Sequence, residues 1–237
     1  RQHTGVLITI HDATEERRKE RERKVQAAMV QEIHHRVKNN LQTVAALLRM
    51  QMRRSKNAEA RQALKDSVGR VMSMAVVHEY LSRAERQAIN IREVTQRIIQ
   101  EIKQGVLNPE KQIHIVLEPG NNLYLPARQA TACALVISEL LQNAVEHGFE
   151  ERSSGTIIVC LEDEGDEVCI KIMDDGEGLP PGFDLAQVSS LGLQIVQTLV
   201  QEDLGGSFEI RSEGGVQVAV RFSKNVWEGE EHWNAQG

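Results

Sequence analysis

The chain of 237 residues is long enough for one large domain or two ordinary ones with a sizeable buried core. A formal net charge of −6 argues against broad electrostatic binding to nucleic acid or to an anionic membrane, and an aromatic content of 3% leaves little for a base-stacking platform. No apolar run approaches the ~20 residues of a membrane-spanning helix, and the first residues lack a secretory apolar core. These features predict a cytoplasmic chain with no membrane segment and no direct binding of nucleic acid.

The three cysteines, Cys133, Cys160 and Cys169, have no CxxC spacing and no nearby paired histidines. Each lies among apolar residues, in the segments TACALVI, IIVCLE and EVCIKI. Free cysteines in such surroundings usually act as small buried hydrophobic residues. We therefore expect buried thiols rather than a zinc site.

The first thirty residues indicate a boundary between two kinds of structure. Residues 5–12 alternate between apolar and polar and then break, which predicts a last strand that leads into a helix. Residues 15–24 are all charged, with both signs mixed. We expect residues 1–14 to end one domain and residues 15–29 to form a solvated linker helix.

Apolar residues at three- and four-residue steps then predict two helices joined by a short polar break at residues 53–57. The first stripe consists of Val30, Ile33, Val37, Leu41, Val44 and Leu48, and the second of Leu64, Val68, Val71, Ala75 and Leu81. Such helices fold back as an antiparallel hairpin, here over residues 30–87. Because a lone hairpin buries only one seam, we expect a homodimer that closes a four-helix bundle.

Residues 88–224 mix helices with strands and predict an α+β sandwich, with helices on one face of a mixed sheet. The expected helices cover residues 91–102, 126–147 and 191–201, and the expected strands are 112–118, 122–125, 156–162, 167–174 and the segments SFEIRS and VQVAVRF. The polar segment 225–237 is expected to be a flexible tail.

Two polar side chains on the predicted helix 126–147 are candidates for holding a cation. Glu139 and Asn143 are four residues apart and therefore share one helix face. Carboxylate and amide oxygens are the hard donors that Mg²⁺ prefers beside phosphates. A Glu/Asn pair is, by itself, more often solvated helix surface.

Two glycine-containing segments further along the chain are candidates for nucleotide contacts. Asp174 ends a strand, and Gly176 and Gly178 after it allow the backbone to approach a flat ligand. A carboxylate at this position can accept a hydrogen bond from the exocyclic amine of adenine. Gly192 opens a helix whose first N–H groups can receive phosphate oxygens. Each segment alone is more often an ordinary turn or loop-to-helix junction, but the three signals in this order favour a nucleotide site.

The order of these segments resembles a known superfamily of ATPases. SELLQNAVEHG, DDGEG, SLGL and LGGSFEI resemble the N, G1, G2 and closing segments of the gyrase, heat-shock chaperone, histidine kinase and MutL ATPases, over residues ~88–223. In the hairpin, EIHHRVKNNLQ resembles the phosphoacceptor box of sensor histidine kinases that read HRxKN, and the chain is similar to PdtaS-type kinases within that subclass. Residues 1–14 resemble the end of a PAS sensor domain.

The resemblance implies ATP and Mg²⁺ as cofactors and a set of site residues. Asn143 would hold Mg²⁺, Glu139 would order its ligands or take a proton, and Asp174 would select adenine. Further nucleotide contacts are implied for His147, Gly176, Gly178, Leu191, Gly192 and Leu193. The implied partners are a second copy of the chain and the receiver domain of a response regulator, of the ANTAR type that binds RNA.

His34 and His35 are adjacent, and helix geometry distinguishes them. At ~100° per residue, His34 lies ~55° from the centre of the first apolar stripe, whereas His35 lies ~155° from it. His35 is therefore the expected phosphoacceptor. Glu32, one turn earlier, is placed to hold the ring of His35 or to help remove its proton.

Two other functions remain open. Ser190 stands where many relatives carry glycine, and Val216 follows Gly215 where a Gly-Thr pair is common. Both departures would suit a signalling scaffold with a degenerate ATP site. A superfamily ATPase acting as a conformational clamp is the third possibility, although such a protein has no need of an exposed histidine box.

Overall fold

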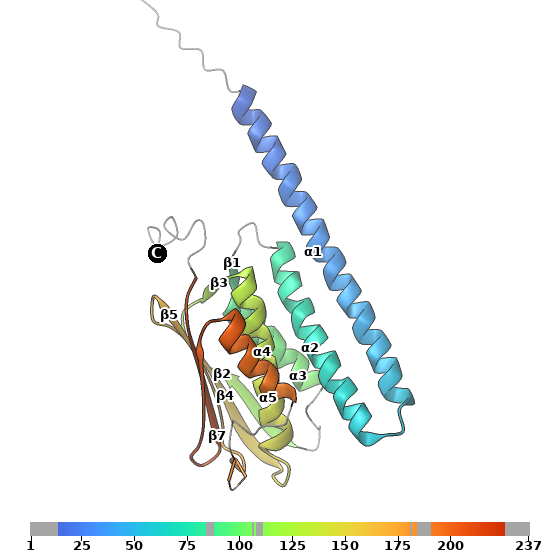
Figure 1. The fold of residues 1–237 in the computed structure, drawn as a ribbon, viewed down its shortest axis with the longest axis vertical. Coiled ribbons are helices and arrows are strands. Elements are labelled where there is room, and N and C mark those ends of the chain that lie inside the picture. The colour runs from blue at the N-terminus through green and yellow to red at the C-terminus, as the bar shows by residue number, and fades with distance from the viewer. Residues whose placement is uncertain are drawn as a thin grey trace, which may run out of the picture.

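The computed structural model describes residues 14–83, 88–105, 107, 111–180, 182–183 and 191–225. A helical hairpin leans against one side of an α/β sandwich (Figure 1). The predicted end of a PAS-like domain, apart from Thr14, lies outside the described residues, as does the predicted tail beyond Asn225. None of the described helices combines the length and the hydropathy that a membrane-spanning segment requires.

The hairpin consists of α1 (Thr14–Arg54) and α2 (Ala58–Arg83). The charged segment predicted as a linker and the first hairpin helix form one continuous helix of 41 residues. The predicted polar break is confirmed, and Asn57 caps α2 by accepting a hydrogen bond from the backbone N–H of Ala60 at 3.2 Å. The turn is therefore determined by local sequence.

The apolar residues of α1 divide between two faces. Ala45 is fully buried, and on the same side Lys38 Nζ lies 3.3 Å from Glu79 of α2. A second group stays exposed, and we call it the outer stripe: Val30, Ile33, Val44 and Leu47. The single predicted stripe is thus split, because one partner helix covers only part of the apolar arc.

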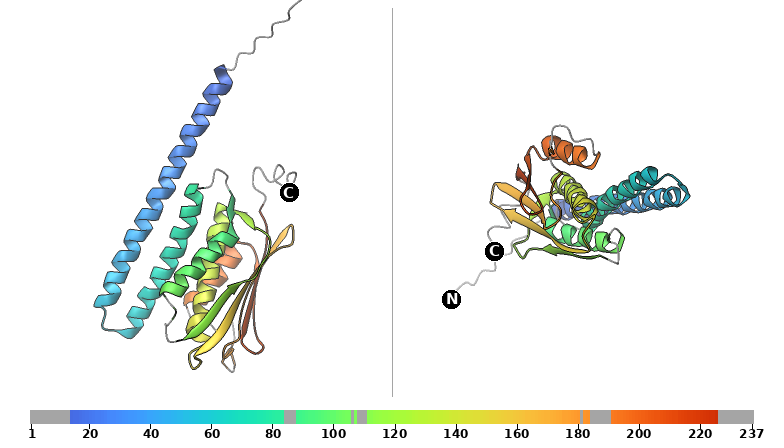
Figure 2. Two further views of the ribbon diagram at one scale, coloured as in Figure 1. Left: turned by 180° about the vertical axis from the view of Figure 1, so that it is seen from behind. Right: turned by 90° about the horizontal axis from the view of Figure 1, so that it is seen from below.

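The sandwich is built on a five-stranded mixed sheet in the order β2-β4-β5-β7-β6. Its strands are β2 (Gln112–Leu117), β4 (Ser154–Asp163), β5 (Glu167–Asp174), β6 (Ser207–Ser212) and β7 (Val216–Ser223). β2 and β4 run parallel, and the other neighbours are antiparallel. The helices α3 (Ile91–Gly105), α4 (Ala127–His147) and α5 (Leu191–Thr198) lie on one face of this sheet (Figure 2). The predicted α+β architecture is confirmed.

Two details differ from the sequence-based expectation. The predicted strand 122–125 is β3 (Tyr124–Pro126), which pairs with an additional short strand, β1 (Ala88–Asn90), in a separate two-stranded sheet. The predicted helix 191–201 ends as α5 at Thr198 and continues as a π-helical turn, Leu199–Asp203. Elements as short as β1 carry too little periodicity to be read from sequence.

The core lies between the sheet and α4, whose residues are buried along most of the helix because α2 covers its other side. The three cysteines are free and buried, as predicted. Burial is the main cause that raises the pKa of Cys160 to about 12, and it also raises the pKa values of Cys133 and Cys169. The thiols therefore stay protonated and serve in packing.

Candidate functional site

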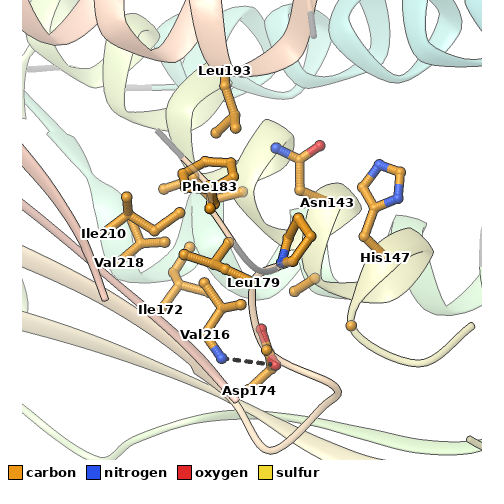
Figure 3. A pocket seen from close by; sticks show the side chains of 16 residues that line it. Asn143, His147, Ile172, Asp174, Leu179, Phe183, Leu193, Ile210, Val216 and Val218 are labelled. Atoms are coloured by element: carbon orange, nitrogen blue, oxygen red, sulfur yellow. Dashed lines mark hydrogen bonds between the residues drawn. The ribbon is translucent and has the colours of Figure 1, made fainter. Parts of the chain in front are cut away.

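A cavity of about 460 Å³ opens between α4, the end of β5 and the start of α5 (Figure 3). One wall is the inner face of the sheet and the other is the last two turns of α4. Its lining residues are Leu140, Asn143, Ala144, His147, Gly148, Ile172, Asp174, Gly178, Leu179, Pro180, Gly182, Phe183, Leu193, Ile210, Val216 and Val218. A mostly apolar lining with a few polar groups is typical of a pocket for a flat organic ligand.

Asp174 is the acidic group at the base of this cavity. Its Oδ1 accepts hydrogen bonds from the backbone N–H groups of Gly176 at 3.0 Å and Val216 at 3.2 Å. These bonds hold the carboxylate in one orientation and leave Oδ2 for a ligand. Burial raises the pKa of Asp174 above its ordinary value, and the two backbone bonds partly oppose that shift.

The glycines of the DDGEG segment allow a close approach of backbones. A Cβ at Gly176 would lie 2.1 Å from the carbonyl oxygen of Gly148, so only glycine fits there. Gly178 has a positive φ of 79°, a conformation that side chains rarely adopt. Both predicted glycines thus shape the cavity. Gly178 lines it, and Gly176 allows its segment to pack against the backbone of Gly148, which also lines it.

Glu139, Asn143 and Gly192 meet at the other end of the site. A Cβ at Gly192 would lie 2.9 Å from Glu139 Oε2 and 3.5 Å from Asn143 Oδ1, so the glycine keeps this space clear. Among the described residues, the buried amide nitrogen of Asn143 has no hydrogen-bond partner. A buried polar atom without a partner is costly unless a ligand satisfies it.

This donor set fits Mg²⁺ bound together with phosphates. The described residues contain no group of three or more His, Cys, Asp or Glu side chains that could hold a metal alone. Mg²⁺ usually takes one or two protein oxygens and completes its shell from phosphates and water. The side-chain oxygen of Asn143 can serve as such a ligand, and Glu139, four residues earlier on the same helix, can bind a water of the metal.

Glu139 is almost wholly buried and is bound by Arg70 of α2, a residue that the sequence gave no reason to select. The Nε atom of Arg70 lies 2.6 Å from Oε1 of Glu139, and its Nη2 atom lies 2.9 Å from Oε2. The hydrogen bond to Glu139 raises the pKa of Arg70, so the guanidinium remains charged. The candidate cation ligand is thus paired with a cation of the protein.

The remaining predicted nucleotide contacts lie at different depths. Leu193 lines the cavity, and His147 stands at its edge with a 70% exposed side chain, 3.6 Å from Glu150. Leu191 is exposed and is not among the lining residues. Sequence reasoning missed Phe183 and Ile210, whose apolar side chains close the cavity. The alternation in β6 could have indicated Ile210.

The structure separates the two adjacent histidines of α1. His34 faces α2, and its Nδ1 atom lies 3.2 Å from Nδ1 of His78. His35 is exposed and lies ~160° from Ile33 around the helix, so it faces neither α2 nor the outer stripe. Glu32 is paired with Arg36 at 2.7 Å and not with His35 in this arrangement.

A helical hairpin followed by an ATPase-type α/β sandwich defines the class of this chain, and comparison with known families agrees. The family described as "Histidine kinase" matches residues 32–106. The family described as "Histidine kinase-, DNA gyrase B-, and HSP90-like ATPase" matches residues 129–226. The chain therefore belongs to the histidine kinases, with an HRxKN-type phosphoacceptor region and a C-terminal ATPase domain.

Individual relatives are consistent with this membership. Sensor histidine kinase PdtaS of Mycobacterium tuberculosis (strain CDC 1551 / Oshkosh) is 45% identical over 220 residues, which cover 92% of this chain and 44% of the relative. PdtaS of Mycolicibacterium smegmatis is 44% identical over the same shares of both chains. This chain spans less than half the length of these relatives.

The histidine kinase domain from the Erythrobacter litoralis EL346 blue-light activated histidine kinase shares the fold. Its TM-score is 0.59 at 24% identity, covering 84% of this chain and 95% of that chain. Because the match covers 84% of this chain, it takes in parts of both the hairpin and the sandwich.

Proposed function

We propose that this chain is the kinase core of a two-component sensor that works in the cytoplasm. It binds Mg-ATP, phosphorylates itself on His35 and passes the phosphoryl group to an aspartate of a response regulator. Residues 30–87 serve as the dimerisation and phosphotransfer hairpin, and residues 88–224 bind ATP. The observation that carries the proposal is an exposed HRxKN histidine in the same chain as a nucleotide-sized cavity with Asp174 at its base.

Asp174 selects the base in this scheme. Oδ2 accepts a hydrogen bond from the exocyclic amine of adenine, while Oδ1 keeps its two backbone donors. Ile172, Val218 and Leu193 provide apolar contacts to the faces of the ring. Guanine presents a carbonyl oxygen where adenine has its amine, so it would be repelled by the carboxylate.

The phosphate groups lie towards Asn143 and Gly192. When bound, Mg²⁺ supplies positive charge that offsets the phosphate oxygens, with Asn143 holding it and Glu139 orienting its water ligands. The first N–H groups of α5, which begins at Leu191, are oriented for an anion. Asn143 also brings an amide nitrogen that a phosphate oxygen would satisfy.

In the first transfer, a ring nitrogen of neutral His35 forms a bond to the γ-phosphorus while the bond to the β,γ-bridging oxygen breaks. ADP leaves, and the proton of the other ring nitrogen passes to a carboxylate, Glu32 or Glu139. Glu32 is one turn from His35, but it must first leave Arg36. In the second transfer, the P–N bond breaks as an aspartate oxygen of the regulator binds phosphorus.

The proposed partners follow from the hairpin. The outer stripe of α1 is apolar and is not covered by α2, so a second copy closes a four-helix bundle over it. The regulator's receiver domain docks at the exposed His35, and the resemblance to PdtaS-type kinases favours a regulator of the ANTAR type.

A single labelling experiment tests this function. The chain is incubated with Mg-ATP, and phosphate that is labile in acid but stable in base is measured on the protein. The proposal predicts such labelling and its transfer to a receiver domain. Hydrolysis without labelling would favour the clamp, and the absence of both activities would favour a scaffold with a degenerate site.

A further inference from the structure

The contact between α2 and α4 is centred on Arg70 and Glu139. The two side chains are 15% and 4% exposed, and two parallel hydrogen bonds join them. Paired bonds between guanidinium and carboxylate are among the strongest polar contacts in proteins and are geometrically specific. Each oxygen of Glu139 therefore already accepts a hydrogen bond.

The neighbouring contacts along the first part of α2 are also polar, whereas Val76 and Val77 further along α2 join the hydrophobic core. Lys65 Nζ lies 3.0 Å from Glu146 Oε1, the amide of Gln142 donates to Asp66 at 2.9 Å, and two hydroxyl groups meet near its centre, Ser73 and Ser138 at 2.7 Å. Ion pairs and amide bonds resemble the contacts of transient interfaces, so relative motion is expected at this polar end of α2 rather than at its apolar end.

Arg70 lies at the phosphate end of the nucleotide site. A Cβ at Gly192 would be 2.9 Å from Glu139 Oε2 and 3.8 Å from Arg70 Nη2. The guanidinium thus lies beside the carboxylate that we assign to water orientation or proton transfer. Because each oxygen of Glu139 already accepts a bond from Arg70, the carboxylate is less available to accept a proton or to orient a metal-bound water.

The position of the hairpin keeps the expected phosphoacceptor apart from Glu139, as in a kinase before autophosphorylation. In both ribbon views α2 lies between α1, which carries His35, and α4, which carries Glu139 (Figures 1 and 2). Whether phosphorylation occurs within one chain or between two, Glu139 has to exchange its partner on α2 for the reacting groups.

We propose that Arg70 is a positioning residue that holds Glu139 out of reaction, and that autophosphorylation requires α2 to withdraw Arg70 from α4. This inference rests on the role proposed above for Glu139. The charged residues 15–29 form the first part of α1, so α1 is a rigid connection through which an upstream signal moves the hairpin.

The test compares Arg70→Gln with Arg70→Lys, using the initial rate of labelling at saturating Mg-ATP and nucleotide affinity by calorimetry. Arg70→Gln should label roughly tenfold faster, within the range typical of coupling between sites, with ATP affinity unchanged or tighter. Arg70→Lys keeps a cation beside Glu139 and should remain near the wild-type rate. A folded Arg70→Gln protein that labels at the wild-type rate or slower would overturn the proposal, because Arg70 would then be neutral or part of catalysis.

A charge exchange tests the same release without altering Glu139 or Arg70. Lys65→Glu and Glu146→Lys should each loosen the contact and speed labelling, and the double variant should return towards the wild-type rate. Faster amide exchange in α2 and α4 should accompany each single change. If the double variant instead labelled even faster than either single variant, the two effects would be additive. That result would contradict the release of this contact as the step that controls labelling.

Failure of the underlying function gives a different result. If neither the wild type nor any variant is labelled while all bind ATP, the proposed kinase activity is refuted and the inference with it. If the wild type is labelled and the Arg70 and Lys65 variants show no gain, only the inference fails.

Discussion

His34 and His78 lie across the hairpin with their Nδ1 atoms 3.2 Å apart and their ring centroids 5.4 Å apart. Burial, together with the facing ring of His34, lowers the pKa of His78 below the ordinary histidine value of 6.5. The pair can share one hydrogen between the two nitrogens only while at least one ring is neutral.

This pair predicts an acid-sensitive hairpin. Because the folded state binds a proton on His78 less readily than the unfolded chain does, stability is lost as pH falls from about 6.5 towards the lowered pKa. His78→Gln, which does not titrate, should flatten this slope in melts followed by circular dichroism between pH 7 and pH 5. A variant with the same slope as the wild type would show that other groups cause it.

His35 is expected to be the sole phosphoacceptor because it faces neither α2 nor the outer stripe. His35→Gln should abolish acid-labile labelling while ATP binding and the mass of the assembly stay unchanged. His34→Gln should reduce labelling or hairpin stability only in part, since His34 packs against His78. The argument from helix faces would fail if the His34 variant lost all labelling and the His35 variant kept it.

Asp174→Asn should weaken ATP binding and stabilise the ligand-free protein. Asparagine Oδ1 can keep both backbone donors, but its amide would point a donor at the adenine amine. Loss of a charged hydrogen bond costs roughly 1.5–3 kcal/mol, or about one to two decades of affinity.

The stability gain follows from the raised pKa of Asp174. Its folded state takes up a proton more readily than the unfolded chain, so the ionised side chain costs stability as pH rises through that pKa. The Asn variant should therefore melt higher at pH 7 without nucleotide. Asp175→Asn, a neighbouring exposed carboxylate that accepts from Thr156, is the matched control and should change ATP affinity little. If calorimetry gave the Asp174→Asn variant the same ATP affinity as the wild type, Asp174 would be excluded from the site.

The parts of the fold that were predictable are those specified by local pattern. The hairpin turn, β5 and α4 each follow from periodicity or capping within a few residues, and the DDGEG glycines indicate a close backbone approach. Val216 stands where many relatives carry the threonine of a Gly-Thr pair. Its backbone N–H still donates to Asp174, because that hydrogen bond does not depend on the side chain.

The parts that could not be predicted depend on segments far apart in the chain. Arg70 and Glu139 are separated by 69 positions, and nothing in the segment around Arg70 distinguishes it from the other basic residues of the hairpin. The same holds for Phe183, whose place in the cavity depends on how the loop after Gly178 folds. The split of α1 into two apolar faces became visible only once the direction of α2 was known.

That split provides the last prediction, which concerns the dimer. Val37 is half-buried within the hairpin, so a charge there would damage hairpin packing as well as any dimer contact. Ile33 belongs to the outer stripe and is 57% exposed in the single chain, so it separates the two effects. Ile33→Glu should leave the hairpin folded and weaken the dimer.

The expected loss is large because a two-fold interface buries the new carboxylate twice. Each uncompensated buried charge costs several kcal/mol, so the dimer dissociation constant should rise roughly a hundredfold or more. Gln42→Glu adds the same charge on the opposite side of α1 and should leave the dimer intact. Light scattering after gel filtration gives the mass, and circular dichroism gives the helix content. A dimeric Ile33→Glu protein, or a wild-type chain that is monomeric at micromolar concentration, would show that the outer stripe is covered by something other than a second copy.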